Sequence, residues 1–131
     1  MDQARETIIY ERIFERFGVR FLRAENGEAE SELLLGEADF NAMGLPFGGI
    51  LFNMADCTAG AAQRSLGSFG MTVSSEARFL RGARNAKRLF CRAKARKEGK
   101  TLGFVDASVE DETGAELAAF SFLFVNYREK S

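Results

Sequence analysis

Residues 40–60, FNAMGLPFGGILFNMADCTAG, determine how this chain of 131 residues folds. The stretch begins as a polar loop, passes through the glycine pair Gly48-Gly49, and continues as an almost wholly apolar helical segment to about Leu66. Its apolar residues surround the predicted helix instead of forming one stripe, which is typical of a helix buried on most sides. One acid, Asp56, interrupts the apolar run. An ionisable side chain in such a place usually has a partner or a catalytic task.

Strands are predicted on both sides of this helix. Before it, Val19 to Ala24 and Glu28 to Leu35 are joined by an Asn-Gly turn, which is a strong signal for a β-hairpin. After it, residues 71–79 alternate between apolar and polar side chains, which predicts a half-buried strand. Its apolar face is expected to carry Met71, Val73, Ala77 and Phe79. Three more strands, joined by short turns that favour antiparallel neighbours, are predicted at residues 89–97, 101–110 and 115–127.

An amphipathic helix is predicted near the start of the chain, over about residues 3–17, because Ile9, Ile13 and Phe17 recur at a spacing of four. The order of elements predicts an α+β fold with a single domain over residues 1–131. In this fold an antiparallel sheet of about five to six strands wraps around the central helix.

The composition excludes several classes of site. The chain has 18 basic and 19 acidic residues, and the net charge of −1 argues against nucleic acid binding through overall charge. It has no histidine, which removes Ser-His-Asp and Cys-His nucleophile systems and zinc sites that contain histidine. Cys57 and Cys91 are not expected to be metal ligands. We expect neither a metal nor a cofactor.

The sequence contains neither a secretory signal nor an apolar run long enough to span a membrane. We therefore expect a cytoplasmic protein that makes no membrane contact. Its two cysteines are expected to be reduced thiols, and Cys57, beside Asp56, to be a small buried residue.

The motif Asn41-x-x-Gly44-x-x-Phe47-Gly48-Gly49, with Asp56 on the following helix, resembles a known family signature. It is similar to N-x-x-G-x-x-H-G-G of the PaaI-like hotdog-fold acyl-CoA thioesterases, which have an acid eight residues beyond the first glycine of the pair. Four later segments, 71–73, 79–83, 99–101 and 111–114, fit the family in order and approximate spacing. The resemblance covers most of the chain from residue 40 and implies a hotdog fold.

The resemblance also implies an activity and its residues. The protein is expected to hydrolyse an acyl-CoA thioester to free coenzyme A and a carboxylic acid. Asn41 and Gly48 are expected on one side of the site, with the backbone N–H of Gly48 polarising the thioester carbonyl. Thr72 and Asp56 are expected on the other side, with the hydroxyl orienting the carboxylate or its water.

One position departs from the family. Phe47 stands where the family has its usual histidine, which makes that wall of the pocket more apolar. The polarising group is a backbone donor, so it survives a change of the neighbouring side chain. Phe47 and Gly49 are expected to line the substrate site.

Elementary chemistry supports the same assignment. Free N–H groups at a helix N-terminus, where Gly48 is predicted, favour a developing oxyanion. Asp56 can act as a general base on water or as a nucleophile that forms an acyl anhydride, and the sequence does not choose. Eight helical residues span about 12 Å, so Gly48 and Asp56 of one helix do not reach the same carbonyl. We therefore expect at least a homodimer. A homotetramer, as a dimer of dimers, is a further expectation that this distance does not address.

A basic segment follows the central helix. Residues 78–100 contain ten basic residues and one acid, Glu98. These residues either face solvent from strands or meet the phosphates of coenzyme A. Arg81 and Arg84, in the loop before a strand, are the better candidates for phosphate binding.

Structural roles stay open for each site residue. Asp56 can be an acid satisfied by backbone donors, and Asn41 can cap a turn. The glycine pair can serve only close packing at the helix start, and Thr72 can be an ordinary strand hydroxyl.

Two other functions compete with thioester hydrolysis. The first is a module of the same fold that binds acyl-CoA without cleaving it. The second is a hydratase or dehydratase of the hotdog superfamily. This second function is disfavoured, because those enzymes resemble a design of histidine plus acid and this chain has no histidine.

Overall fold

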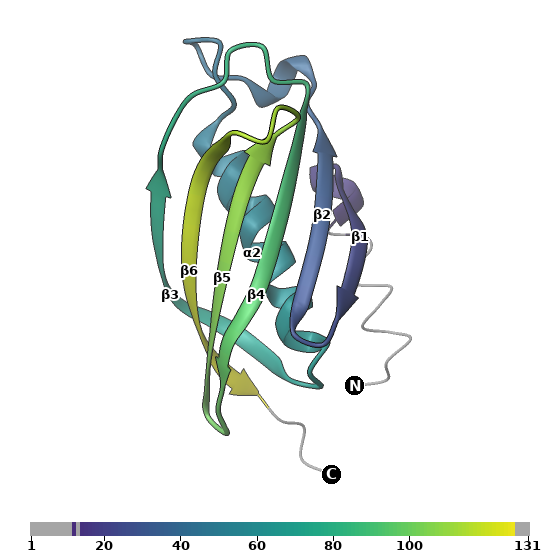
Figure 1. Ribbon diagram of the computed structural model, residues 1–131, viewed down its shortest axis with the longest axis vertical. Helices are drawn as coiled ribbons and strands as arrows, with labels where there is room; N and C mark the ends of the chain where they lie inside the picture. Colours follow the sequence, from purple (N-terminus) through teal and green to yellow (C-terminus); the bar gives the residue numbers. More distant parts are fainter. Residues whose placement is uncertain (1–11, 13, 128–131) are drawn as a thin grey trace.

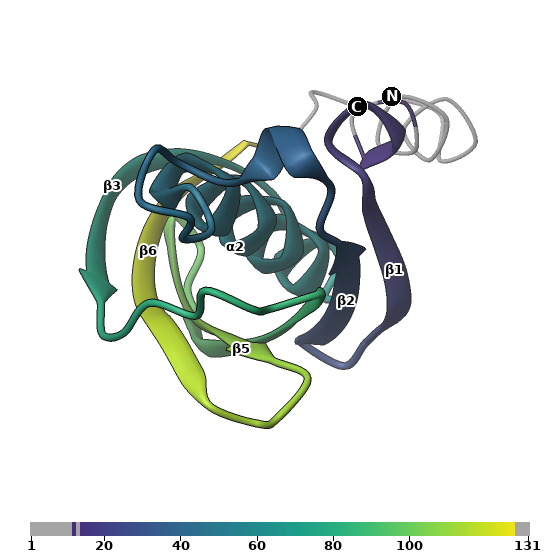
Figure 2. The same ribbon diagram turned by 90° about the horizontal axis from the view of Figure 1, so that it is seen from above.

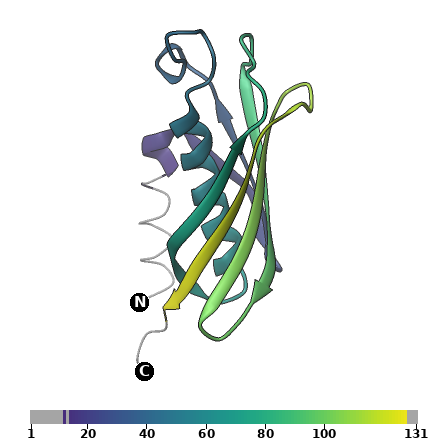
Figure 3. The same cartoon turned by 90° about the vertical axis from the view of Figure 1, so that its left-hand side faces the viewer.

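The computed structural model describes residue 12 and residues 14–127. Six strands form one antiparallel sheet in the order β1-β2-β4-β5-β6-β3, and the sheet curls around the long helix α2 (Figures 1 and 2). Figure 3 shows α2 on one face of this sheet. The elements are β1 Val19–Glu25, β2 Glu28–Leu34, the 3-10 turn η1 Glu37–Asp39, α2 Gly48–Arg64, β3 Phe69–Phe79, β4 Arg88–Glu98, β5 Leu102–Asp111 and β6 Glu116–Tyr127.

The predicted α+β architecture is confirmed. The central helix begins at the glycine pair and ends at Arg64, two residues before the predicted end. The β1–β2 hairpin turns at Asn26 and Gly27, with φ of 52° and 79°, and these left-handed values explain the Asn-Gly pair. Of the helix predicted over residues 3–17, residue 12 and residues 14–17 are helical, and the rest lies outside the described residues.

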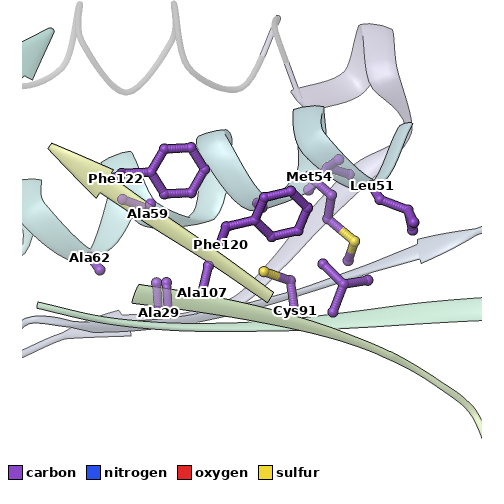
Figure 4. Packing of buried hydrophobic residues seen from close by; sticks show 14 of the residues in the cluster. Ala29, Leu51, Met54, Ala59, Ala62, Cys91, Ala107, Phe120 and Phe122 are labelled. Atoms are coloured by element: carbon purple, nitrogen blue, oxygen red, sulfur yellow. The ribbon is translucent and has the colours of Figure 1, made fainter. Parts of the chain in front are cut away.

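The core lies between α2 and the concave face of the sheet. Met54 and Ala55 of α2 are fully buried, and Phe120 and Phe122 of β6 meet the helix from the sheet. Figure 4 shows Met54, Phe120 and Phe122 packed between α2 and the sheet, where Ala59 continues the buried side of the helix. Small residues on the helix let the sheet approach closely, and the aromatic rings of β6 fill the remaining space.

The prediction of a half-buried strand at residues 71–79 is wrong for a single copy of the chain. Within the described part of the chain, β3 is an edge strand that pairs only with β6, and every residue from Met71 to Phe79 is exposed. The alternation is also interrupted by a bulge between Thr72 and Ser74. A bulge places an extra residue on one strand, so the inward and outward positions exchange beyond it.

The bulge has a direct consequence for Thr72. Thr72 lies opposite Phe124 and Ala77 lies opposite Phe120, and both phenylalanines are buried against the helix side. Residues that face each other across an antiparallel pair share a face, so Thr72 points to the helix side. Met71 lies opposite Val125 and takes the other face, contrary to the sequence pattern.

Candidate functional site

The structure brings Asp56 and Thr72 together. Asp56 lies in the middle of α2, and the Thr72 hydroxyl on β3 donates a hydrogen bond of 2.8 Å to Asp56 Oδ1. The carboxylate is half-buried, at the border between the helix and the edge strand. This contact exists because the β3 bulge turns Thr72 toward α2.

Burial raises the pKa of the Asp56 carboxyl above its ordinary value of 3.8, and the Thr72 hydrogen bond opposes this shift. Desolvation disfavours the charged form, whereas a donor to the carboxylate favours it. A raised pKa makes Asp56 a better proton acceptor than a solvated aspartate when it is ionised. The neighbouring Cys57 thiol has a pKa raised to about 11 by burial and by the Asp56 charge, so it is protonated at neutral pH.

Replacement of Thr72 by valine tests this balance. Removal of the donor leaves desolvation unopposed, so the pKa of Asp56 rises further. If a reaction at this site needs the ionised Asp56 carboxylate, the acid limb of the rate–pH profile of that reaction moves to higher pH in Thr72→Val. Thr72→Ser keeps the donor and is expected to retain the wild-type profile. An unchanged acid limb in Thr72→Val would contradict the role of this bond.

The first residues of α2 present free backbone donors. The Phe47 carbonyl accepts hydrogen bonds from the N–H groups of Ile50 (2.9 Å) and Leu51 (3.3 Å). Among the described residues, the N–H groups of Gly48 and Gly49 donate no hydrogen bond. They lie at the positive end of the helix dipole, which favours an oxyanion or a polarised carbonyl oxygen.

Two phenyl rings flank this glycine pair. A Cβ added to Gly49 would lie 2.5 Å from the Phe47 ring, and one added to Gly48 would lie 3.4 Å from the Phe79 ring. Both rings are more than half exposed, at 55% and 56%. Phe47 therefore lies beside the free amides. Phe79 is an additional neighbour that the sequence did not assign to the site, because its approach to α2 depends on the path of β3.

Asn41 organises the loop before α2. Its Oδ1 accepts hydrogen bonds from the N–H groups of Met43 (2.9 Å) and Leu45 (3.1 Å), and its own N–H donates to the Leu45 carbonyl at 2.8 Å. These contacts match the turn-capping role. Because Oδ1 is engaged in the loop, the side-chain amide nitrogen is the group that Asn41 can offer to a ligand.

Arg81 and Arg84 lie in the connection between β3 and β4, at the end of the molecule where α2 begins (Figure 1). Arg84 Nη1 donates to the Met43 carbonyl at 3.0 Å and so ties this connection to the loop of Asn41. Arg81 lies near Asp111, whose pKa is lowered chiefly by the Thr113 hydroxyl and to a smaller extent by the Arg81 charge. Both arginines are exposed, with guanidinium donors available to an anion.

Other members of the basic segment behave as strand residues facing solvent. Arg92 lies 3.7 Å from both Glu30 and Glu110 on the neighbouring strands, and Arg96 lies 3.4 Å from Asp106. Of these residues, Glu30, Arg92 and Asp106 line a shallow depression of about 430 Å³ that also includes Ser108 and Ser121. It lies on the sheet face opposite α2, away from Asp56. Its mixed charges are largely paired within the chain and indicate no ligand.

The structure does not bring Gly48 and Asp56 together within one chain. Both belong to α2, so about 12 Å of helix separates them. Among residue 12 and residues 14–127, no group of three or more His, Cys, Asp or Glu residues is arranged to hold a metal ion. Within the same residues, no helix is long and apolar enough to cross a membrane.

Residues 43–118, more than half of the chain, match the model of the thioesterase superfamily. A protein of Archaeoglobus fulgidus named "Putative esterase" is 26% identical over 84 residues, which are 64% of this chain and 54% of that protein. The chain thus spans about half the length of this curated relative.

Solved structures share the fold. The PaaI protein from the phenylacetic acid degradation operon of E. coli has a TM-score of 0.88 at 21% identity, over 93% of each chain. A hypothetical thioesterase protein of Streptococcus pneumoniae TIGR4, solved with coenzyme A, has a TM-score of 0.88 at 18% identity. That match covers 95% of this chain and 99% of the other. These similarities confirm the predicted hotdog fold and the PaaI-like resemblance.

Proposed function

Because the chain belongs to the thioesterase superfamily, we propose that it hydrolyses acyl-CoA thioesters to free coenzyme A and a carboxylic acid. The observation that carries this proposal is the hydrogen bond from Thr72 on β3 to Asp56 on α2. The first N–H groups of the same helix are free. A carboxylate with a raised pKa and a set of unpaired amides are the two groups that thioester hydrolysis requires.

In the proposed reaction the Gly48 N–H donates to the thioester oxygen. Asp56 then takes a proton from a water that attacks the carbonyl carbon, and the tetrahedral intermediate expels the thiolate of coenzyme A. Alternatively, the Asp56 carboxylate attacks directly, and water hydrolyses the resulting anhydride. In both routes one water is consumed, and a carboxylic acid and a thiol are released.

We assign the remaining site residues to substrate binding. Phe47 and Gly49 adjoin the polarising amide and would line the acyl side of the site. The Asn41 side chain holds the loop before α2 and can offer its amide nitrogen to the substrate. Arg81 and Arg84 are exposed at the same end of the molecule and would meet the phosphates of coenzyme A.

The proposed site needs two copies of the chain. Gly48 of one copy and Asp56 of another would act on the same thioester, because one helix does not place both within reach. The edge strand β3 is the surface we propose for this contact. It carries Met71 (68% exposed) and Val73 (56% exposed) next to an unpaired strand edge, which is a ready template for a second strand.

A lysine at Val73 is expected to convert the dimer to monomers and to abolish thiol release, because a charge on an edge strand opposes pairing. The matched control is Leu22→Lys on β1, the other edge of the sheet, where the side chain is 48% exposed. Sedimentation velocity measures the mass of each variant. A Val73→Lys protein that stays dimeric would refute this interface, whereas one that is monomeric and fully active would refute the two-copy site.

The decisive test of the activity is a panel of aromatic and aliphatic acyl-CoAs with detection of the released thiol. Wild-type protein is expected to release coenzyme A from some of these substrates, whereas Asp56→Ala is expected to release none above background. Failure of the wild type on the whole panel, or equal rates for the two proteins, would overturn the proposal.

A second candidate, an acyl-CoA-binding module without turnover, is favoured by one observation. Phe47 occupies the position of the family histidine, and its exposed ring borders the free amides. Calorimetric binding of intact acyl-CoA, with no thiol released over the same period, would identify this function.

A further inference from the structure

Asn53 is a polar residue of α2 that the site described above does not use. It is half-buried, and among the described residues its amide makes no hydrogen bond. It lies three residues before Asp56 and four after Gly49, so the three residues lie on the same side of the helix. This side also carries the half-buried Cys57. Because the Asn53 side chain is only partly buried, its amide is open to water or to a group of a second copy of the chain.

Symmetry places Asn53 in the proposed dimer. If Gly48 of one copy lies beside Asp56 of the second, a two-fold axis makes the reverse pairing hold as well. The two α2 helices are then antiparallel, and the residue midway between Gly48 and Asp56, residue 52, lies at the level of the axis. A residue on such an axis meets its own counterpart.

Of the three residues at this level, Leu51 and Phe52 have their side chains packed within the chain. Leu51 is 5% exposed in the core, and the Phe52 ring packs edge-on against Phe120 and Phe122, with ring centroids 5.9 and 5.7 Å apart. Asn53 is as partly buried as Phe52, but its side chain has neither a hydrogen bond nor a ring contact within the described residues. We infer that Asn53 lies on the two-fold axis of the active dimer and pairs with Asn53 of the second copy. This inference rests on the proposed two-copy site.

In the proposed pair, each Asn53 side chain both donates and accepts a hydrogen bond. Each amide nitrogen donates to the amide oxygen of the other copy, so two reciprocal hydrogen bonds form. A polar residue that pairs with its own counterpart across a helix contact fixes the register of the two helices. Here the register matters, because a slip of one turn would move Asp56 by about 5.4 Å from the carbonyl held at Gly48. Asn53 is therefore a positioning residue of the site.

Disulfide trapping tests this position. The variant combines Asn53→Cys with Cys57→Ser, and Cys91 is kept because it is fully buried. Directly facing Cα atoms of two packed helices lie about 4–6 Å apart, which suits a disulfide. Under copper phenanthroline the variant is expected to run on a non-reducing gel at twice the monomer mass and to return to monomer mass on reduction.

The wild type supplies a matched control. Its Cys57 lies on the same side of α2, but two copies of Cys57 would be offset by about 12 Å along the antiparallel helices. Wild-type protein is therefore expected to remain uncrosslinked under the same oxidant. Cross-linking of the wild type to the same extent as the variant would contradict the register.

The outcomes separate this inference from the proposed activity. A variant that is dimeric in sedimentation and active, yet not cross-linked, overturns the position of Asn53 and leaves thioester hydrolysis standing. Efficient cross-linking of the variant, together with a wild type that turns over no acyl-CoA, supports the position and overturns the activity. A wild type that is monomeric and active overturns the two-copy site and this inference together.

A charge substitution keeps the inference testable if the cysteine variant does not fold. Asn53→Asp would place two carboxylates against each other and is expected to weaken dimer formation about tenfold or more at pH 7. Asn85→Asp makes the same change in an exposed loop and is expected to leave dimer affinity unchanged. Equal dimer affinity in Asn53→Asp and wild type would overturn the inference.

Discussion

Replacement of Asp56 by asparagine is expected to lower kcat for acyl-CoA hydrolysis by about 10²–10⁴-fold, the usual contribution of a positioned general base. The change removes the proton acceptor and the anionic nucleophile but keeps the shape of the side chain. The amide oxygen of the new side chain can still accept the Thr72 hydrogen bond, so the local structure is retained. Thiol release under substrate saturation measures the effect, and KM is expected to change little.

The same variant should be more stable than the wild type at neutral pH. Burial raises the pKa of Asp56 in the folded state above its unfolded value, so the folded protein binds the proton more tightly. The ionised carboxylate therefore costs stability above the folded-state pKa, and this cost disappears as the pH falls below the unfolded value of 3.8. The neutral amide removes the cost, which is the common trade between stability and activity at a site.

Thermal unfolding of both proteins at pH 7 and at acid pH checks the sign of this stability difference. A higher Tm for Asp56→Asn at pH 7, with a difference that shrinks toward low pH, would show that the desolvated Asp56 carboxylate destabilises the folded protein. A lower Tm at pH 7 would indicate that Asp56 is a structural acid, because its loss would then remove a stabilising contact. Retained activity together with a lower Tm would establish that structural role.

Local signals explain which parts of the fold the sequence predicted. The glycine pair, the apolar run to residue 64 and the Asn-Gly turn each act over a few residues, and each predicted an element close to its observed bounds. The pairing of Asp56 with Thr72 was also anticipated, through the family motif. Periodicity by itself placed Thr72 on the outward face of its strand.

Features set by strand order were not predictable in this way. Nothing within residues 71–79 indicates that the strand lies at the sheet edge, because that depends on the pairing of β6 with both β5 and β3. The bulge beside Thr72 likewise appears only when β3 is aligned with β6. The approach of Phe79 to Gly48 follows from the same alignment.

A polar cluster at the other end of α2 was also missed, because its members are far apart in the sequence. Gln63 is 1% exposed and donates through Nε2 to Asn126 Oδ1 on β6. The Asn126 amide nitrogen donates to Glu98 Oε1 at 2.6 Å and to the Gly99 carbonyl at 2.8 Å. This network joins the last turn of the helix to the sheet, and each residue read alone is an ordinary polar side chain.

Gly103 on β5 leaves the room that this cluster needs. A Cβ at this position would lie 2.6 Å from Gln63 Nε2 and 2.9 Å from Glu98 Oε2. The Gly103 φ is not in the left-handed region, so alanine fits the backbone and the conflict is purely steric. We expect Gly103→Ala to lower the free energy of unfolding by about 2–4 kcal/mol, through overpacking and the disturbed buried hydrogen bonds.

Urea unfolding at one fixed protein concentration measures the loss, since dimer formation would otherwise shift the midpoint. The control is a double-mutant cycle with Gln63→Ala, which removes the atoms that the new methyl group would meet. The double variant should be more stable than the sum of the single effects implies, because residues in contact couple by about 0.5–3 kcal/mol. Additive effects, or an unchanged Gly103→Ala protein, would show that Gln63 moves aside without cost. In that case the glycine has no packing role toward the end of α2.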